Sequence, residues 1–89
     1  MSTEDIKNNL YNMIKETYKI ADDDDEFTTD VHLFDYGYID SFGAVDLISR
    51  IEKTYGIEIT NKDLMQYSLN TINEIAEFVD RKVTECSRQ

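Results

Sequence analysis

The sequence predicts a small all-α domain, and three observations favour this fold class. Apolar residues recur at helical spacing in three separate segments, whereas only one short stretch alternates in the manner of a β-strand. The sequence contains no proline, a residue that breaks helices, so these segments can be continuous helices. The chain has 89 residues, which suffices for one domain with one small core. We therefore expect residues 1–89 to form a single domain built from helices.

The first helix is expected over about residues 4–19. Its predicted inward stripe consists of Ile6, Leu10, Met13, Ile14 and Tyr18. Either Ser2 or Thr3 can cap this helix. Two acidic residues follow directly, and they suit the positive end of the helix dipole.

Residues 21–40 form a long acidic connection, which holds eight acidic residues and neither Lys nor Arg. A connection of this length in a compact domain usually has a functional reason or is partly disordered. We expect Leu33 and Phe34 to pin it to the core and Gly37 to supply a turn.

The second helix is expected from about Ser41 to Tyr55, with Gly56 as the residue that ends it. Its predicted core-facing residues are Ala44, Leu47, Ile48, Ile51 and Tyr55. On a helical wheel, Phe42 and Val45 point well away from that stripe. They form an exposed apolar pair close to Ser41, unless Phe42 folds under the preceding loop.

The remaining chain is expected to hold a short helical turn and a last helix. Residues 56–59 alternate like a strand but lack an obvious partner, so we interpret them as an extended linker whose isoleucines pack inward. Residues 62–67 are expected to form the short turn, with Leu64 and Tyr67 facing inward. The last helix should begin near residues 71–74, which have capping-box spacing. Its predicted buried stripe consists of Ile72, Ile75, Ala76, Val79 and Val83.

The charge of the chain limits the partners that it can bind. The sequence has 19 acidic and 9 basic residues, which gives a net charge of −10. This excess argues against nucleic acids and anionic membranes, because phosphate contacts need Lys and Arg. Basic protein partners are the natural expectation, although such a charge can equally serve solubility alone.

A cytoplasmic location is expected from three further features. No apolar run approaches the roughly 20 residues of a membrane span, so membrane insertion is not expected. Residues 1–5 are acidic and polar, unlike a signal peptide. The single cysteine, Cys86, cannot form an internal disulfide, which suits a reducing compartment.

Ser41 lies where the acidic loop turns into the second helix. The free N–H groups of a first helical turn and the helix dipole favour a phosphate at this position. No nearby residue is suited to activate the serine as a nucleophile, so the sequence favours a serine that receives a phosphorylated group. The alternative is that Ser41 or Asp40 simply caps the helix, because both residue types are preferred there.

The residues around Ser41 resemble the attachment motif of acyl and peptidyl carrier proteins. The motif is Asp40-Ser41-Phe42, preceded by Leu33-Phe34 and Gly37 and followed by Val45-Asp46-Leu47. The similarity continues over residues 55–59 and, more loosely, over residues 70–75. The resemblance implies a small four-helix bundle of the acyl-carrier type, with its core over about residues 4–82 and a long loop between the first two helices.

The same resemblance implies a function. Ser41 would carry a 4′-phosphopantetheine arm, which a phosphopantetheinyl transferase moves from coenzyme A, and the arm would hold an acyl or aminoacyl group as a thioester. A loading ligase and downstream transferases would be the other partners. Asp40 resembles the family's residue that lies at the metal of the transferase. Phe42, Val45 and Asp46 match positions that meet partner enzymes. The chain itself would be a monomeric, non-catalytic carrier.

Two departures from the acyl-carrier pattern concern these partners. Arg50 and Lys53 make the second helix less uniformly acidic than in many fatty-acid carriers. The segment between Ile59 and Ile72 is also slightly longer than in those carriers. Since the second and third helices usually make the partner contacts, both departures bear on which enzymes the chain meets.

The identity of the cargo is harder to infer from the residues than the attachment site. The run over residues 33–43 is similar to free-standing D-alanyl carrier proteins, which favours a small amino acid. A small core, partly filled by Tyr55 and Tyr67, would give a long fatty acyl chain little room. Fatty acyl and polyketide cargoes stay open, as does a different class: a small acidic interaction module without a prosthetic group.

No intrinsic catalytic or metal site is expected. The acidic run does not fit an EF-hand, because a loop that starts at Asp24 has Thr29 where glycine is needed and Asp35 where glutamate is usual. His32 is the only histidine and no Cys/His cluster accompanies it, so zinc is not expected. A triad of Ser41, His32 and a carboxylate would lack an oxyanion loop and a pocket.

Overall fold

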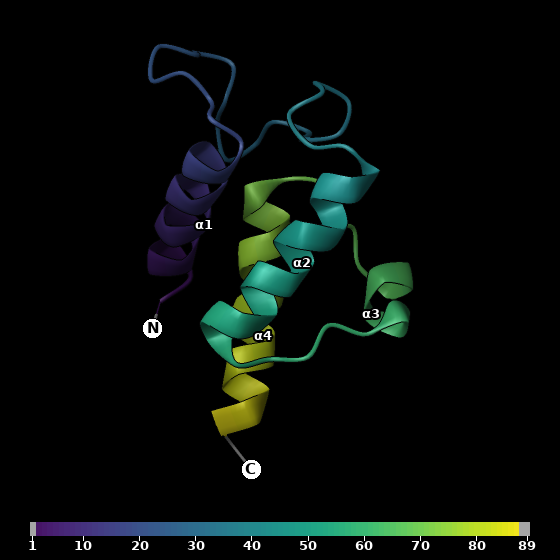
Figure 1. Ribbon diagram of the computed structural model, residues 1–89. Helices are drawn as coiled ribbons and strands as arrows, with labels where there is room; N and C mark the ends of the chain where they lie inside the picture. The colour runs from purple at the N-terminus through teal and green to yellow at the C-terminus, as the bar shows by residue number, and fades with distance from the viewer. Residues whose placement is uncertain (1, 88–89) are drawn as a thin grey trace.

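A computed structural model describes residues 2–87 of the chain, apart from the side chains of Ser41, Cys86 and Ser87. In this part of the chain the regular structure is entirely helical (Figure 1). The helices are α1 (Thr3–Thr17), α2 (Ser41–Tyr55), α3 (Asn61–Gln66) and α4 (Ile72–Ser87). The predicted fold class, a small four-helix bundle of the acyl-carrier type with a long loop after the first helix, is confirmed.

The three longer helices lie together, and the short α3 stands at their side (Figure 1). α1 and α4 make the most extensive helix-to-helix packing in the described chain. The loop between α1 and α2 arches over one end of the bundle, while the described chain begins and ends toward the other. The N-terminus of α2 therefore lies at the loop end of the molecule.

The core is formed by all three longer helices and by the loop. Its largest fully buried side chains are Ile6, Leu10, Ile14, Leu33, Ile51, Ile72 and Val79. The apolar stripes predicted for α1, α2 and α4 therefore face inward, except that Ile48 of α2 lines a groove instead of the core. Phe78 on α4 is also buried, although the predicted stripe did not include it.

Local hydrogen bonds set both ends of α1. Ser2 is the N-cap, and its hydroxyl accepts the Asp5 N–H at 3.2 Å. At the other end Lys19 has a φ of 53°, and the Ile20 N–H reaches the Lys15 carbonyl at 3.0 Å. This left-handed closure is one that glycine usually provides. It ends α1 two residues earlier than predicted.

The long loop is held to the core by more residues than predicted. Leu33 is fully buried, as expected, but Phe34 is 37% exposed. Phe27, Val31 and Ile39 are buried as well. These three residues follow no helical period, so periodicity alone did not indicate them.

The turn predicted at Gly37 is confirmed. Gly37 has a φ of 77°, a conformation that side chains disfavour, and its N–H donates to the Phe34 carbonyl at 3.1 Å. Phe34 is the first residue of this turn. Its ring lies at the edge of a groove that is described below.

Two aspartates of the acidic run order the loop. Asp22 Oδ1 lies 2.8 Å from Lys15 Nζ. Asp24 accepts the Glu26 N–H at 3.0 Å and the Tyr38 hydroxyl at 2.9 Å. Burial of Tyr38, followed by its hydrogen bond to Asp24, raises the pKa of the phenol to about 12. Part of the acidic run thus has a structural role in the loop.

Polar contacts place α3. Thr60 caps the helix and forms a capping box with Asp63, whose Oδ2 lies 2.9 Å from Lys82 Nζ on α4. Asp63 is therefore the buried residue of α3, while Leu64 is 40% exposed. Leu64, which was predicted to face inward, lies outside the core and lines a groove beside it.

The segments on either side of α3 lie as predicted. Ile57 is buried and Ile59 packs against the core, so residues 56–59 are an extended linker. Tyr67 packs against Phe78 of α4, with ring centroids 5.2 Å apart. Together these contacts hold α3 beside α2 and α4.

Candidate functional site

An aspartate caps the N-terminus of α2. Asp40 has an extended backbone (φ −101°, ψ −175°), and its Oδ1 accepts the Gly43 N–H at 2.7 Å. Ser41 is the first residue of the helix, while its side chain lies outside the described part of the structure. Of the two residues considered for the cap, the structure therefore assigns Asp40.

The first turn of α2 holds no acidic residue, so Asp40 at the cap is the carboxylate nearest to it in sequence. The free N–H groups at a helix start attract anions. The backbone at Ser41 thus occupies a position that suits a phosphate ester.

The C-cap tyrosine of α1 reaches this turn. The Tyr18 hydroxyl donates to the Gly43 carbonyl oxygen at 2.6 Å. A Cβ at Gly43 would lie 3.1 Å from both Tyr18 Cε1 and Ile39 Cγ2, so a larger residue there would require one of these side chains to shift. The sequence indicated Tyr18 only as part of the core stripe, because neither the bond nor the close approach has a local sequence signal.

Apolar side chains are exposed beside the attachment motif. Phe42 is 88% exposed and Val45 is 70% exposed. The alternative in which Phe42 folds under the loop is therefore wrong. Met65 of α3 is also 88% exposed, and the sequence analysis did not single it out. Asp46 is exposed too, but its Oδ2 lies 2.7 Å from Arg50 Nε one turn along α2.

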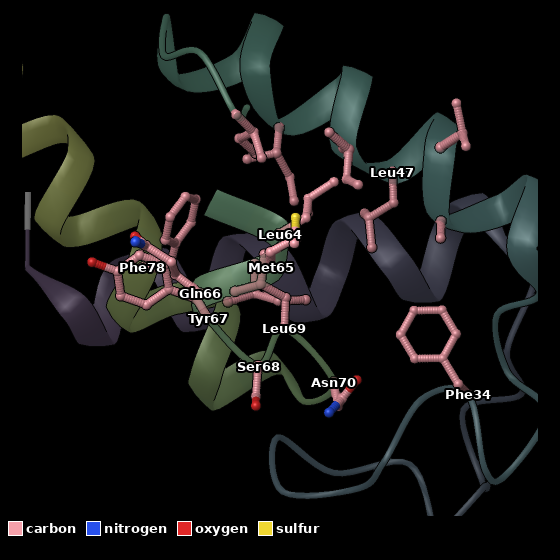
Figure 2. A pocket seen from close by; sticks show the side chains of 16 residues that line it. Phe34, Leu47, Leu64, Met65, Gln66, Tyr67, Ser68, Leu69, Asn70 and Phe78 are labelled. Carbon is pink, nitrogen blue, oxygen red and sulfur yellow. The ribbon is translucent and has the colours of Figure 1, made fainter. Parts of the chain in front are cut away.

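An apolar groove runs between α2, α3 and α4 (Figure 2). Its volume is about 620 Å³. Leu47 lines it from α2 and Phe78 from α4, while Leu64 and Met65 line it from α3. Phe34 lies at one end of the groove and Tyr67 at the other. The prediction of a small core with little room did not include this groove.

Other polar features of the described chain serve the fold. His32 Nδ1 accepts the Asp35 N–H at 3.1 Å, so the histidine closes a turn in the loop. No three His, Cys, Asp or Glu side chains among the described residues gather as metal ligands. None of the described helices has the length and apolar character needed to cross a membrane.

The sequence profile of the family described as "Phosphopantetheine attachment site" matches residues 8–79. The chain belongs to this family of carrier proteins. It is similar to a D-alanyl carrier protein of Bacillus pumilus, with 34% identity over 73 residues that cover 82% of this chain and 91% of that protein. A D-alanyl carrier protein of Streptococcus suis is 32% identical over 71 residues, which cover 80% of this chain and 86% of that protein.

The similarity also extends to a carrier with a different name. An acyl carrier protein of Lactobacillus johnsonii is 33% identical over 79 residues, which cover 89% of this chain and 94% of that protein. The chain is therefore a non-catalytic carrier protein with a covalently bound 4′-phosphopantetheine group. These relatives leave the choice between acyl and aminoacyl cargo open.

The residues at the start of α2 fit such a group. Asp40 and Phe42, which flank Ser41, are both exposed, so a group attached between them would lie at the surface. Asp40 already fills the cap position, so capping does not require the serine. The positive helix end suits the phosphate.

Proposed function

We propose that Ser41 is the residue that carries the phosphopantetheine arm. The observation that supports this most directly is the cap. Asp40 Oδ1 accepts the Gly43 N–H, so Asp40 is the N-cap, and Ser41 follows it as the first residue of the helix, between two exposed neighbours. The remaining serines, Ser2, Ser49, Ser68 and Ser87, have no such motif around them.

The chain would receive the arm as the substrate of a phosphopantetheinyl transferase. The Ser41 hydroxyl oxygen would form a bond to the pantetheine phosphorus of coenzyme A, while the bond from that phosphorus to adenosine 3′,5′-bisphosphate breaks. The hydroxyl proton would pass to a base of the transferase. Asp40 is exposed, so its carboxylate can approach the magnesium ion of that enzyme. Since coenzyme A is the donor, we place this step in the cytoplasm.

The arm's thiol would hold the cargo as a thioester, and the protein would act as the surface that enzymes recognise. Phe42 and Val45 are proposed as apolar docking residues, because both are exposed beside Ser41. Asp46 would add charge at the edge of this surface. The partners would be the transferase, a loading ligase and downstream transferases.

For the cargo, we propose a small amino acid. The support is the similarity to D-alanyl carrier proteins. The groove of about 620 Å³ favours a second candidate, an acyl chain that lies between α2 and α3. Thermal unfolding of loaded protein separates the two, because a chain buried in the groove raises the Tm and an exposed aminoacyl group does not. A clear rise with an octanoyl group, together with failure to accept an amino acid from a ligase, would establish the acyl candidate.

The attachment itself is tested by intact mass. Apo protein is incubated with coenzyme A and a broad-specificity phosphopantetheinyl transferase. Wild type should gain one phosphopantetheinyl group, whereas Ser41→Ala should gain none. An unmodified wild type would favour the alternative of an interaction module and overturn the proposal.

A further inference from the structure

Tyr18 is fixed by the end of α1. It is the C-cap residue of that helix, and its N–H donates to the Ile14 carbonyl at 3.0 Å. Directly after it, Lys19 adopts the left-handed conformation, and the Ile20 N–H closes the helix end onto Lys15. The backbone position of Tyr18 is therefore set by the end of α1.

Gly43 is held through both of its backbone groups. Its N–H donates to Asp40 Oδ1 at 2.7 Å, and its carbonyl oxygen accepts the Tyr18 hydroxyl at 2.6 Å. The ring also lies against the glycine, because a Cβ there would be only 3.1 Å from Tyr18 Cε1. The Asp40 cap is a local contact that holds the start of α2. The Tyr18 hydrogen bond connects the same turn to the end of α1.

This arrangement connects α1 with the turn that presents Ser41, since Gly43 follows the serine by two residues. We propose that Tyr18 is a positioning residue for the modification of Ser41: its hydroxyl holds the first turn of α2 against α1, in the orientation that a phosphopantetheinyl transferase meets. This inference rests on the attachment to Ser41 proposed above.

The phenol is suited to such a role over a wide pH range. Burial, followed by the charge of Asp46, raises the pKa of Tyr18 above its ordinary value. Asp40 acts in the same direction, and Arg50 acts against it. The hydroxyl thus stays a hydrogen-bond donor wherever the transferase works.

A displacement of the first turn of α2 would lower the rate at which phosphopantetheine is transferred to Ser41. A misplacement of about 1 Å at a reacting atom can reduce a rate about 100-fold, because the reacting groups must meet in one geometry. Loss of the Tyr18 hydroxyl would leave Val45 and Asp46, which follow the first turn of α2, in place, so initial binding would change little. The effect should appear in kcat and not in KM for the carrier.

The test compares Tyr18, the C-cap of α1, with Tyr11 inside that helix, because both hydroxyls donate to a backbone carbonyl. Tyr18→Phe removes the bond to Gly43, and Tyr11→Phe removes the bond of the Tyr11 hydroxyl to the Phe27 carbonyl at 3.4 Å. Both variants keep their rings, and circular dichroism and thermal unfolding check that each is folded. Initial rates of phosphopantetheinylation are measured against carrier concentration for wild type and both variants.

For Tyr18→Phe we expect kcat to fall roughly 3–10-fold at nearly constant KM, the range that one neutral hydrogen bond provides. Tyr11→Phe should match wild type in both constants. Equal kcat values for the two variants, whether unchanged or reduced together, would overturn the positioning role of Tyr18. Such a result would leave the attachment to Ser41 intact, whereas an unmodified wild type would overturn the proposed function as well.

Discussion

Arg50 Nε lies 2.7 Å from Asp46 Oδ2, one helical turn apart on the exposed side of α2. Asp46 is one of the residues that we propose for partner recognition, and this ion pair offsets its charge. A basic partner would therefore meet a less acidic surface than the net charge of −10 suggests. Phe42 and Val45 are exposed beside the pair. We therefore expect these apolar residues to contribute more to partner binding than the charge of Asp46.

The first prediction concerns this ion pair. Arg50→Ala should leave Asp46 unpaired and so strengthen attraction to a basic partner at low salt. We expect a lower KM for the transferase at low ionic strength and a steeper rise of KM with salt than for wild type. Stability should change little, because exposed pairs of this kind contribute little. Kinetics at several salt concentrations measure the effect, and equal salt dependence of the two proteins would refute it.

A second prediction separates the core from the docking surface on one helix. Leu47 is 4% exposed, whereas Val45 is 70% exposed. Leu47→Ala should lower the free energy of unfolding by about 2–5 kcal/mol, because it removes buried side-chain volume. Val45→Ala should unfold at nearly the wild-type urea concentration yet raise KM for a partner enzyme. Similar losses of stability in both variants would contradict the assignment of the helix faces.

A third prediction follows from the helix end at Lys19. A residue other than glycine is strained in the left-handed conformation. Lys19→Gly removes this strain, but glycine also has more conformational freedom in the unfolded chain. The net gain in the free energy of unfolding should be about 0.5–1 kcal/mol. Lys7→Gly, in the interior of α1, provides the control and should destabilise by about 1 kcal/mol. Urea unfolding gives both values. A loss of stability in Lys19→Gly would contradict this prediction, because the Lys19 side chain would then stabilise the fold by more than the backbone strain destabilises it.

The fourth prediction concerns pH and the anchor of α3. The Thr60 backbone N–H, followed by Lys82, holds the pKa of the Asp63 carboxyl below its usual value. A carboxylate with a lowered folded pKa stabilises the fold above its unfolded pKa, and this contribution disappears as the pH falls through the folded value. Wild type should therefore lose part of its stability below about pH 4, the ordinary range of an aspartate.

Asp63→Asn isolates that contribution. It should lower the Tm at neutral pH, because Lys82 loses its partner, and its Tm should fall less steeply in acid than that of wild type. Asp23→Asn, which removes an exposed carboxylate of the loop, should follow the wild-type curve. Parallel acid curves for wild type and Asp63→Asn would contradict the role of the Asp63–Lys82 pair.

Helical periodicity predicted much of this fold, and its failures have physical reasons. The bounds of α2 and the ending at Gly56 agree with the structure, because the apolar spacing and the glycine are both local signals. Phe27 and Ile39 are buried in the loop without any period, so only the tertiary structure indicates them. Leu64 lies on the groove and not in the core, because a capping box and a distant lysine turn Asp63 inward.

The sequence predicted only those features of the candidate site that depend on residues close together in the chain. The motif at residues 40–42 indicated an attachment serine, and the wheel placed Phe42 and Val45 on the exposed face. The bond between Tyr18 and Gly43 joins residues far apart in sequence, so no spacing rule could indicate it. The groove likewise depends on how α3 is anchored beside α2, which the sequence pattern did not describe.

The attachment of phosphopantetheine to Ser41 is tested most directly by mapping the modification to a residue. Wild type, Ser41→Ala and Ser68→Ala are incubated with coenzyme A and transferase, digested, and sequenced by tandem mass spectrometry. Ser68 is an exposed serine outside the motif and serves as the matched control. We predict one phosphopantetheinyl group on Ser41 in wild type and in Ser68→Ala, and no group in Ser41→Ala. A group on any other residue, or a modified Ser41→Ala protein, would contradict the account.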